Sequence, residues 1–136
     1  MDEMRKLRQS ISNLDKALIR LEEALMEDTN NSLIVDGTIR RFEFTIELYW
    51  KTLKRMLQAE GIESKTPRET LKEAYQAGWL QNDHLWLQML KDRNETSHTY
   101  DEETALRILK NIKSYFPEMK ETFIMLKGKV EDDDRL

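Results

Sequence analysis

The sequence predicts an all-α protein, an up-and-down four-helix bundle with one additional short helix. Apolar residues recur at alternating spacings of three and four along three long stretches, which is typical of amphipathic helices with a heptad seam. The 136 residues include only 4 Gly and 2 Pro. A β-sandwich or barrel needs a turn about every 8–12 residues, usually built from Gly and Pro, so the composition disfavours those folds.

Two long antiparallel helices are expected in the first half of the chain. The first apolar stripe covers residues 4–25 and the second covers residues 39–56, with a polar loop at residues 28–32 between them. Gly61 follows the second stripe, where a glycine can end a helix in the left-handed conformation. Two such helices predict an α-hairpin that forms half of a bundle.

A short third helix and a fourth helix follow. Thr66 can cap the short helix, Pro67 suits its first position, and Glu69 completes a capping box. Asn82 or Asp83 can cap the fourth helix, whose apolar positions lie within residues 86–90. We expect this fourth helix to end in the polar stretch that follows.

The last helix is expected to begin after Asp101 and carries an apolar stripe over residues 105–126. Pro117 lies inside this stripe, and an interior proline costs about 3 kcal/mol, so the helix is expected to bend or restart there. The predicted domain therefore covers residues 1–128. Residues 129–136 are rich in acids and are expected to form a disordered tail.

The composition excludes several classes of function. The chain has no Cys and two His that lie 14 residues apart, so neither a disulfide framework nor a metal site is expected, and no cofactor is predicted. No apolar run approaches the roughly 18 residues of a membrane span, and the first residues do not resemble a signal peptide. These observations predict a cytoplasmic protein without a membrane partner.

One segment, residues 91–104, is almost entirely polar although it lies between two amphipathic helices. In a continuous helix Arg93 and His98 point about 140° away from each other, so they converge only if the helix ends between Asn94 and Ser97. One interpretation is an interhelical loop in which Arg93 and His98 bind helix-end carbonyls. The other interpretation is a site for phosphate chemistry.

The chemical interpretation depends on what these side chains do to a phosphodiester. The Arg93 guanidinium can bind a phosphate in a bidentate way, and the His98 imidazole can move a proton near neutral pH. Asn94 and Ser97 can position the phosphate. This set fits metal-independent RNA cleavage through a 2′,3′-cyclic phosphate. Because two proton transfers are needed and each chain offers one such His, a symmetric homodimer is expected.

These residues carry a resemblance to a known family. The sequence Arg93-Asn94-x3-His98-x-Tyr100 resembles the Arg-x4-His-x-Tyr motif of the HEPN family, and within it the nucleotidyltransferase substrate-binding proteins. The resemblance covers roughly residues 5–127. Further matching positions are residues 41–44, Trp50, Lys51 and Trp86.

The resemblance implies a two-gene toxin–antitoxin system whose partner is a minimal nucleotidyltransferase encoded nearby. It implies a ribonuclease that uses Arg93 and His98 and is silenced when the transferase attaches AMP to Tyr100. The older description of the family implies instead a non-catalytic subunit that binds nucleotide or substrate for the transferase. A third interpretation is a structural helical protein with a polar loop.

The second helix has a local excess of positive charge. Residues 38–58 contain five Lys or Arg and two acids, which fits either a surface that attracts RNA or nucleotide or an ordinary solvated helix face. Glu47 lies beside the apolar stripe of this helix. It can pair with Arg93, assist His98, or form an exposed bridge to Lys51 one turn away.

Overall fold

The computed structural model describes the backbone of residues 2–135 and the side chains of residues 2–132. Within this range the chain forms five α-helices and one 3₁₀ turn, and no strand. The helices are α1 (Asp2–Leu25), α2 (Ser32–Ala59), α3 (Pro67–Gln76), α4 (Asp83–Glu95) and α5 (Glu102–Arg135), with the 3₁₀ turn η1 (Thr96–His98) between α4 and α5. The prediction of an all-α bundle with a short extra helix is confirmed.

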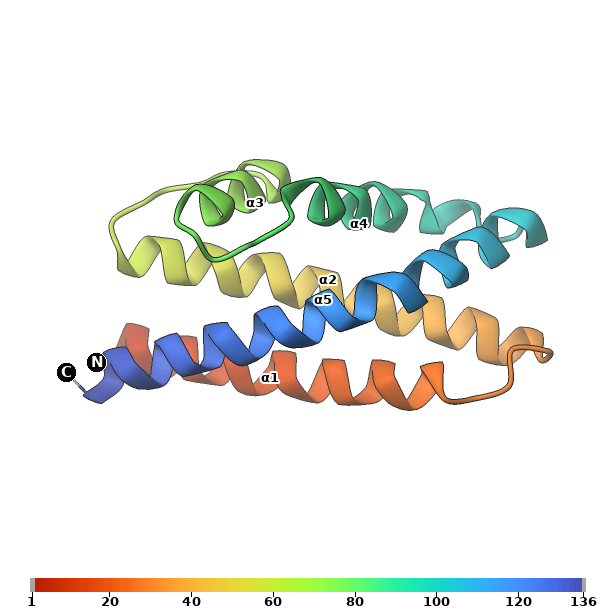
Figure 1. The fold of residues 1–136 in the computed structure, drawn as a ribbon, viewed down its shortest axis with the longest axis horizontal. Helices are drawn as coiled ribbons and strands as arrows, with labels where there is room; N and C mark the ends of the chain where they lie inside the picture. Colours follow the sequence, from red (N-terminus) through yellow and green to blue (C-terminus); the bar gives the residue numbers. More distant parts are fainter. Residues whose placement is uncertain (1, 136) are drawn as a thin grey trace.

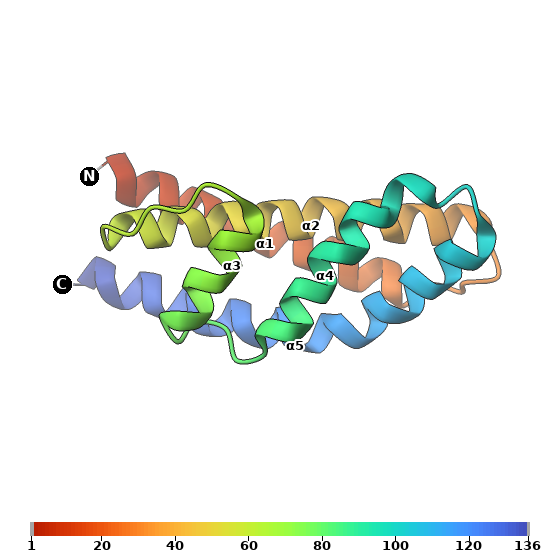
Figure 2. The ribbon, with the colours of Figure 1, turned by 90° about the horizontal axis from the view of Figure 1, so that it is seen from above.

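The helices form a bundle in which α3 and α4 share one side. Helices α1 and α2 run antiparallel and side by side, and α5 lies along both (Figure 1). Helices α3 and α4 follow each other across α2 and α5, on the side away from α1 (Figures 1 and 2). The two ends of the chain lie at one end of the bundle (Figure 1). The α1–α2 loop and η1 lie at the opposite end.

The apolar stripes of the sequence form the core. Met4 and Leu25, the two ends of the first stripe, are half-buried. The other two stripes are buried at every position: Ile39, Phe42, Ile46, Tyr49, Leu53 and Met56 in the second, and Ala105, Ile108, Ile112, Tyr115, Phe116, Met119, Phe123 and Leu126 in the last. Leu71, Ala74 and Tyr75 are spaced as one apolar face of α3, and of these Tyr75 is 43% exposed whereas the other two are buried. No helix in the described part of the chain is long and apolar enough to cross a lipid bilayer.

Helices α3 and α4 begin at residues that the sequence predicts as caps. Thr66 accepts a hydrogen bond from the Glu69 amide at 3.1 Å, and Asn82 accepts one from the Leu85 amide at 3.1 Å. Asn31, in the loop before α2, caps that helix by accepting from the Leu33 amide at 2.9 Å. Gly61 has φ 79°, in the left-handed region that favours glycine. It follows directly after the C-cap of α2, as the sequence predicts.

Helix α5 is continuous through Pro117, so of the two expected outcomes, a bend or a restart, the structure contains the bend (Figure 2). The helix bends in its middle (Figure 2), because a proline lacks an amide donor and its ring crowds the carbonyl four residues before it. The predicted domain boundary at residue 128 falls inside α5: Val130 is buried, and Lys129 pairs with Glu60 of α2 at 3.6 Å. Leu136, the last residue of the predicted tail, lies outside the described residues.

Candidate functional site

The helix that enters the polar segment ends at the position that the sequence predicts. Helix α4 ends at Glu95 and is followed by the single 3₁₀ turn η1. The Thr96 hydroxyl donates to the Arg93 carbonyl at 2.7 Å, and the Thr99 hydroxyl donates to the Thr96 carbonyl at 3.0 Å. These threonines therefore satisfy carbonyls at the end of α4, and the Arg93 and His98 side chains are left for other contacts.

Arg93 reaches across to helix α2. Its guanidinium forms an ion pair with the Glu47 carboxylate and donates to Asn94 Oδ1 at 3.1 Å. Glu47 also accepts from Trp50 Nε1 at 3.3 Å and pairs with Lys51 Nζ at 3.7 Å. The pairing of Glu47 with Arg93 and its bridge to Lys51 were alternatives in the sequence, and the structure contains both. About one third of the Arg93 side chain, 34%, stays exposed.

His98 and Tyr100 lie on the surface beyond the end of α4. The two rings approach edge to face with 6.1 Å between their centroids. His98 and Ser97 are both exposed, and the Tyr100 side chain is 86% exposed. Neither His98 nor the Arg93 guanidinium hydrogen-bonds a helix-end carbonyl within residues 2–132. That contact is what the structural-loop interpretation requires.

The structure does not join Arg93 and His98 directly. Both leave the same end of α4, but no hydrogen bond links the two side chains in the described part of the chain. Arg93 lies on the side that faces α2, whereas His98 ends the turn that leads into α5.

A second polar cluster lies behind this segment, and sequence reasoning missed it. Asp92 is only 2% exposed, and its carboxylate accepts hydrogen bonds from three side chains of α5. Tyr115 Oη donates to Oδ2 at 2.6 Å, Asn111 Nδ2 donates to Oδ2 at 2.9 Å, and Arg107 Nη1 lies 3.4 Å from Oδ1. Arg107 also contacts Glu95. The cluster fixes the end of α4 against α5, and it thereby sets the position from which Arg93 projects.

A signal for this cluster is present in the sequence. Asp92 continues the three-residue spacing of Trp86 and Met89, so it lies on the buried face of α4. A charged residue on a buried face needs partners, and three polar residues spaced by four lie on one face of α5. Burial raises the pKa of the Tyr115 hydroxyl and the hydrogen bond to Asp92 raises it further, so Tyr115 stays a neutral donor.

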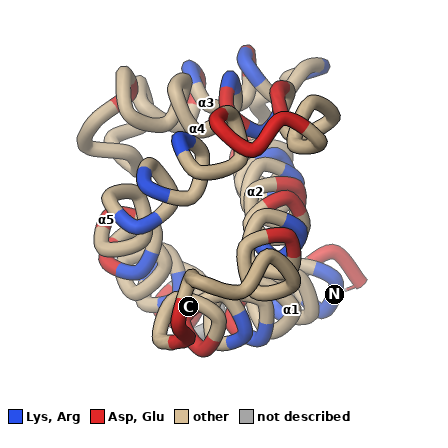
Figure 3. The backbone as a smooth tube through the Cα atoms, turned by 90° about the vertical axis from the view of Figure 1, so that its right-hand side faces the viewer, with Lys and Arg blue, Asp and Glu red and all other residues tan. Residues whose placement is uncertain are grey.

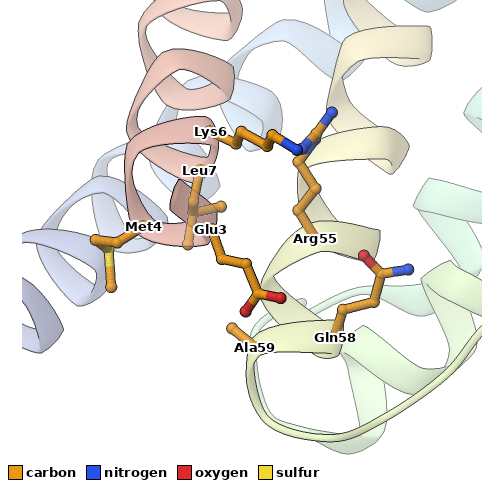
Figure 4. Close-up of a pocket in the computed structure, with 7 residues that line it drawn as sticks. All are labelled: Glu3, Met4, Lys6, Leu7, Arg55, Gln58 and Ala59. Carbon is orange, nitrogen blue, oxygen red and sulfur yellow. The ribbon is translucent and has the colours of Figure 1, made fainter. Parts of the chain in front are cut away.

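Four of the five positive charges of α2 line two separate surfaces. Arg40, Arg41 and Lys51 line a groove between α1 and α2. Arg55 lines another pocket, of about 420 Å³, near the amino-terminal end of α1. Figure 4 shows Arg55 and the α1 residue Lys6 reaching toward the same space. This pocket lies near the termini, far from η1, and so it does not belong to the candidate site.

The charges around η1 are of the opposite sign. Residues 101–103 are all acidic and open α5 directly after the turn, and the end-on view shows acids gathered there (Figure 3). Helix α2 carries acids and bases in alternation (Figure 3).

Within residues 2–132 no three His, Asp or Glu side chains come together in an arrangement that could hold a metal ion.

The fold and the site together define a class: helical bundles that carry an Arg-x4-His-x-Tyr segment at the end of the fourth helix. Residues 9–127 match the protein family described as "Nucleotidyltransferase substrate binding protein like". The chain belongs to this family. The resemblance predicted from the segment around Arg93 is thereby confirmed.

Relatives support the same assignment. The chain is 30% identical over 125 residues to a Haemophilus influenzae protein named "Probable ribonuclease HepT", across 80% of this chain and 86% of the relative. A crystal structure from Thermus thermophilus superposes with TM-score 0.77 and 32% identity, covering 86% of this chain and 98% of the other. A Haemophilus influenzae structure, described as showing the fold of a substrate-binding domain of a nucleotidyltransferase, has TM-score 0.67 and 26% identity over 91% and 98%.

Proposed function

We propose that this chain is a metal-independent endoribonuclease, the HEPN-type toxin of a two-gene system whose antitoxin is a minimal nucleotidyltransferase. The observation that carries the proposal is the end of α4, where Arg93, His98 and Tyr100 leave the bundle close together in the chain and His98 and Tyr100 are exposed. The relative named as a probable ribonuclease supports the reaction, and the matching family supports the transferase as partner.

The reaction needs a phosphate clamp, a base and an acid. Arg93 binds the scissile phosphate, aided by Asn94 and Ser97, and His98 takes the proton of the adjacent 2′-hydroxyl. The 2′-oxygen then bonds to phosphorus while the bond to the 5′-oxygen breaks. The leaving oxygen takes a proton from His98 of a second copy in a homodimer. The products are a 2′,3′-cyclic phosphate and a free 5′-hydroxyl.

The two histidines of the chain provide a matched test of this mechanism. Cleavage of single-stranded RNA is measured with EDTA present for the wild type, His98→Ala and His84→Ala. We expect His98→Ala to lose about 100-fold or more in rate, because the imidazole transfers the proton. His84→Ala is expected to keep full activity, because His84 is exposed in the first turn of α4, away from the site. Equal rates in all three proteins, or no cleavage by any, contradict the proposal.

Tyr100 is the proposed site of control. Its phenolic oxygen attacks the α-phosphorus of ATP on the transferase, pyrophosphate leaves, and the phenolic proton passes to solvent. The attached AMP places a negative charge next to His98, whose ring lies 6.1 Å from that of Tyr100, and repels the RNA phosphate. Mass spectrometry after incubation with the neighbouring-gene transferase and ATP tests this step. Tyr100→Phe is expected to abolish the added mass, whereas the control Tyr75→Phe, also an exposed tyrosine, keeps it.

A second candidate function is a non-catalytic subunit that binds nucleotide or substrate for the transferase. The similar structure described as a substrate-binding domain of a nucleotidyltransferase favours it. This function predicts that the pure protein binds nucleotide and the transferase but cleaves no RNA. Cleavage that depends on His98 excludes it as the sole role of the chain. Absence of both nucleotide binding and transferase binding contradicts it directly.

A further inference from the structure

A groove of about 690 Å³ lies between α1 and α2, next to the candidate site. Glu47, the carboxylate that pairs with Arg93, forms part of its lining. Lys51, which shares that carboxylate, lines the groove as well. A polynucleotide strand held at Arg93 can therefore continue into this groove without leaving the protein surface.

The groove contains an exposed aromatic ring. Phe44 is 52% exposed, although Phe42, two positions earlier on α2, is completely buried. The Arg40 guanidinium lies over the Phe44 ring, 4.5 Å from its centroid. The guanidinium covers part of the ring, and the rest of this half-exposed ring is a surface on which a nucleic-acid base can stack, whatever the identity of the base.

The charge of the groove suits a phosphate backbone. Five Lys or Arg side chains and a single acid, Glu47, line it, although the whole chain has a net charge of −4. Lys16 and Arg20 stand one turn apart on α1 and line the same groove. The guanidinium of Arg40 pairs with Glu43 at 3.5 Å, an exposed contact that a phosphate can replace at little cost. Positive charge concentrated in a groove attracts nucleic acid and makes binding depend on salt.

We propose that this groove binds the single-stranded RNA that flanks the scissile phosphate. A base next to the cleavage position stacks on Phe44, and the backbone phosphates bind Lys16, Arg20 and Arg40. The proposal rests on the proposed function, since it supplies the path by which substrate reaches Arg93 and His98. Duplex RNA is a poor ligand for this groove, because its bases are already stacked on one another.

A second copy of the chain is a less suitable occupant. In a two-fold symmetric contact the same surface meets itself, so the five cations of one groove would face the five cations of the other. RNA instead neutralises these charges. The geometry therefore favours a polyanion over a second copy.

The test measures RNA binding without cleavage. The full chain carrying His98→Ala is titrated against a fluorescently labelled single-stranded RNA of mixed sequence, and anisotropy gives the affinity at several salt concentrations. We expect Phe44→Ala to weaken binding about 10-fold. Arg40→Glu is expected to weaken binding similarly and to lower the salt slope by about 0.7, the value for one phosphate contact on a single strand.

Two matched controls separate the groove from general effects. Arg55→Glu makes the same charge change on the same helix, but in the separate pocket of Figure 4. Ile124→Ala removes an apolar side chain that is 62% exposed on α5. Both are expected to change the affinity less than about twofold, since neither side chain lines the groove. Light scattering is expected to give the same molar mass for Phe44→Ala as for its parent.

Several results overturn the groove proposal: no RNA binding by the His98→Ala protein, equal losses in the controls, or a changed molar mass for Phe44→Ala, which would make the groove a protein interface. Tight binding of duplex RNA also contradicts it. The experiment distinguishes a failure of the groove proposal from a failure of the proposed ribonuclease function. If the groove variants weaken binding but the wild type never cleaves RNA, the groove proposal is supported and the ribonuclease proposal is contradicted. If cleavage depends on His98 but the groove variants bind normally, the ribonuclease proposal is supported and the groove proposal is contradicted.

Discussion

Asp92 and Arg93 are neighbours on α4, yet their side chains belong to two polar clusters of different kinds. The Asp92 carboxylate is buried and accepts from three side chains of α5, so its hydrogen-bonding capacity is used within the protein. Arg93 is partly exposed, and within residues 2–132 its five donors contact only Glu47 and Asn94. The first cluster holds two helices together. The second keeps donors free for a ligand, and this difference separates a structural contact from a candidate site.

The largest expected effect is on stability, from Asp92→Ala. Removing the carboxylate leaves the Tyr115 hydroxyl, the Asn111 amide and part of the Arg107 guanidinium without their acceptor. We expect a loss of roughly 3 kcal/mol in the free energy of unfolding, measured by urea denaturation. Glu121→Ala, which removes an exposed carboxylate from α5, is the control and is expected to change it by less than about 0.5 kcal/mol. Similar losses in both variants would show that the Asp92 cluster does not stabilise the bundle.

The contrast between the clusters also shows what a sequence can and cannot predict. Apolar spacing reports burial directly, so the stripes of α1, α2 and α5 and the end of α4 near Glu95 were predictable. Spacing also places Asp92 on the buried face of α4. It does not identify the partners of Asp92, because these depend on which face of α5 meets α4, and spacing within one helix does not contain that information. The sequence also left open whether α5 bends or restarts at Pro117. The buried residues on both sides of it favour one continuous helix, which needs only to bend.

Alkaline pH is expected to weaken the interior without a mutation. Burial raises the pKa of Tyr115 and that of Tyr49, which donates to the Met119 carbonyl at 2.8 Å. The unfolded chain releases these protons near pH 10, whereas the folded chain retains them. Stability is therefore unaffected by these groups below about pH 10 and falls as the pH rises above it, by about 1.4 kcal/mol per pH unit for each tyrosine. Urea denaturation at several pH values, with tyrosinate absorbance, checks this. Ionisation of Tyr49 or Tyr115 near pH 10 in the still-folded protein would contradict it.

Tyr115→Phe isolates one hydrogen bond of the Asp92 cluster. The ring remains packed and only the 2.6 Å bond to the carboxylate is lost, so we expect a loss of about 1.5 kcal/mol, the usual value for a hydrogen bond to a charged group. The destabilisation by alkaline pH should also become smaller, because one of the two shifted tyrosines is gone. Tyr75→Phe, at an exposed tyrosine, is the control in the same denaturation series and should unfold like the wild type. An unchanged midpoint for Tyr115→Phe would assign the cluster's stability to Arg107 and Asn111 alone.

The smallest effect on stability is expected at the other cluster, from Glu47→Gln. The Glu47 and Arg93 side chains are 27% and 34% exposed, although Glu47 Oε1, the oxygen that faces Arg93, is itself buried. We expect a loss of about 1 kcal/mol in the free energy of unfolding, the upper value for an exposed ion pair. The same change removes the carboxylate that competes with phosphate for Arg93 and Lys51. We therefore expect single-stranded RNA to bind up to about fivefold more tightly, which corresponds to about 1 kcal/mol.

Glu60→Gln is the matched control, because it removes the carboxylate that pairs with Lys129 at the far end of α2. It is expected to leave RNA affinity unchanged, as the pair lies away from Arg93. If Glu47→Gln instead lowered the unfolding free energy as much as Asp92→Ala, the Arg93 cluster would be a second structural contact. If it tightens RNA binding while the fold is unaffected, Glu47 restrains the phosphate-binding arginine until substrate replaces it. Asp92 would then have a structural role, whereas its neighbour Arg93 would remain available to bind a ligand.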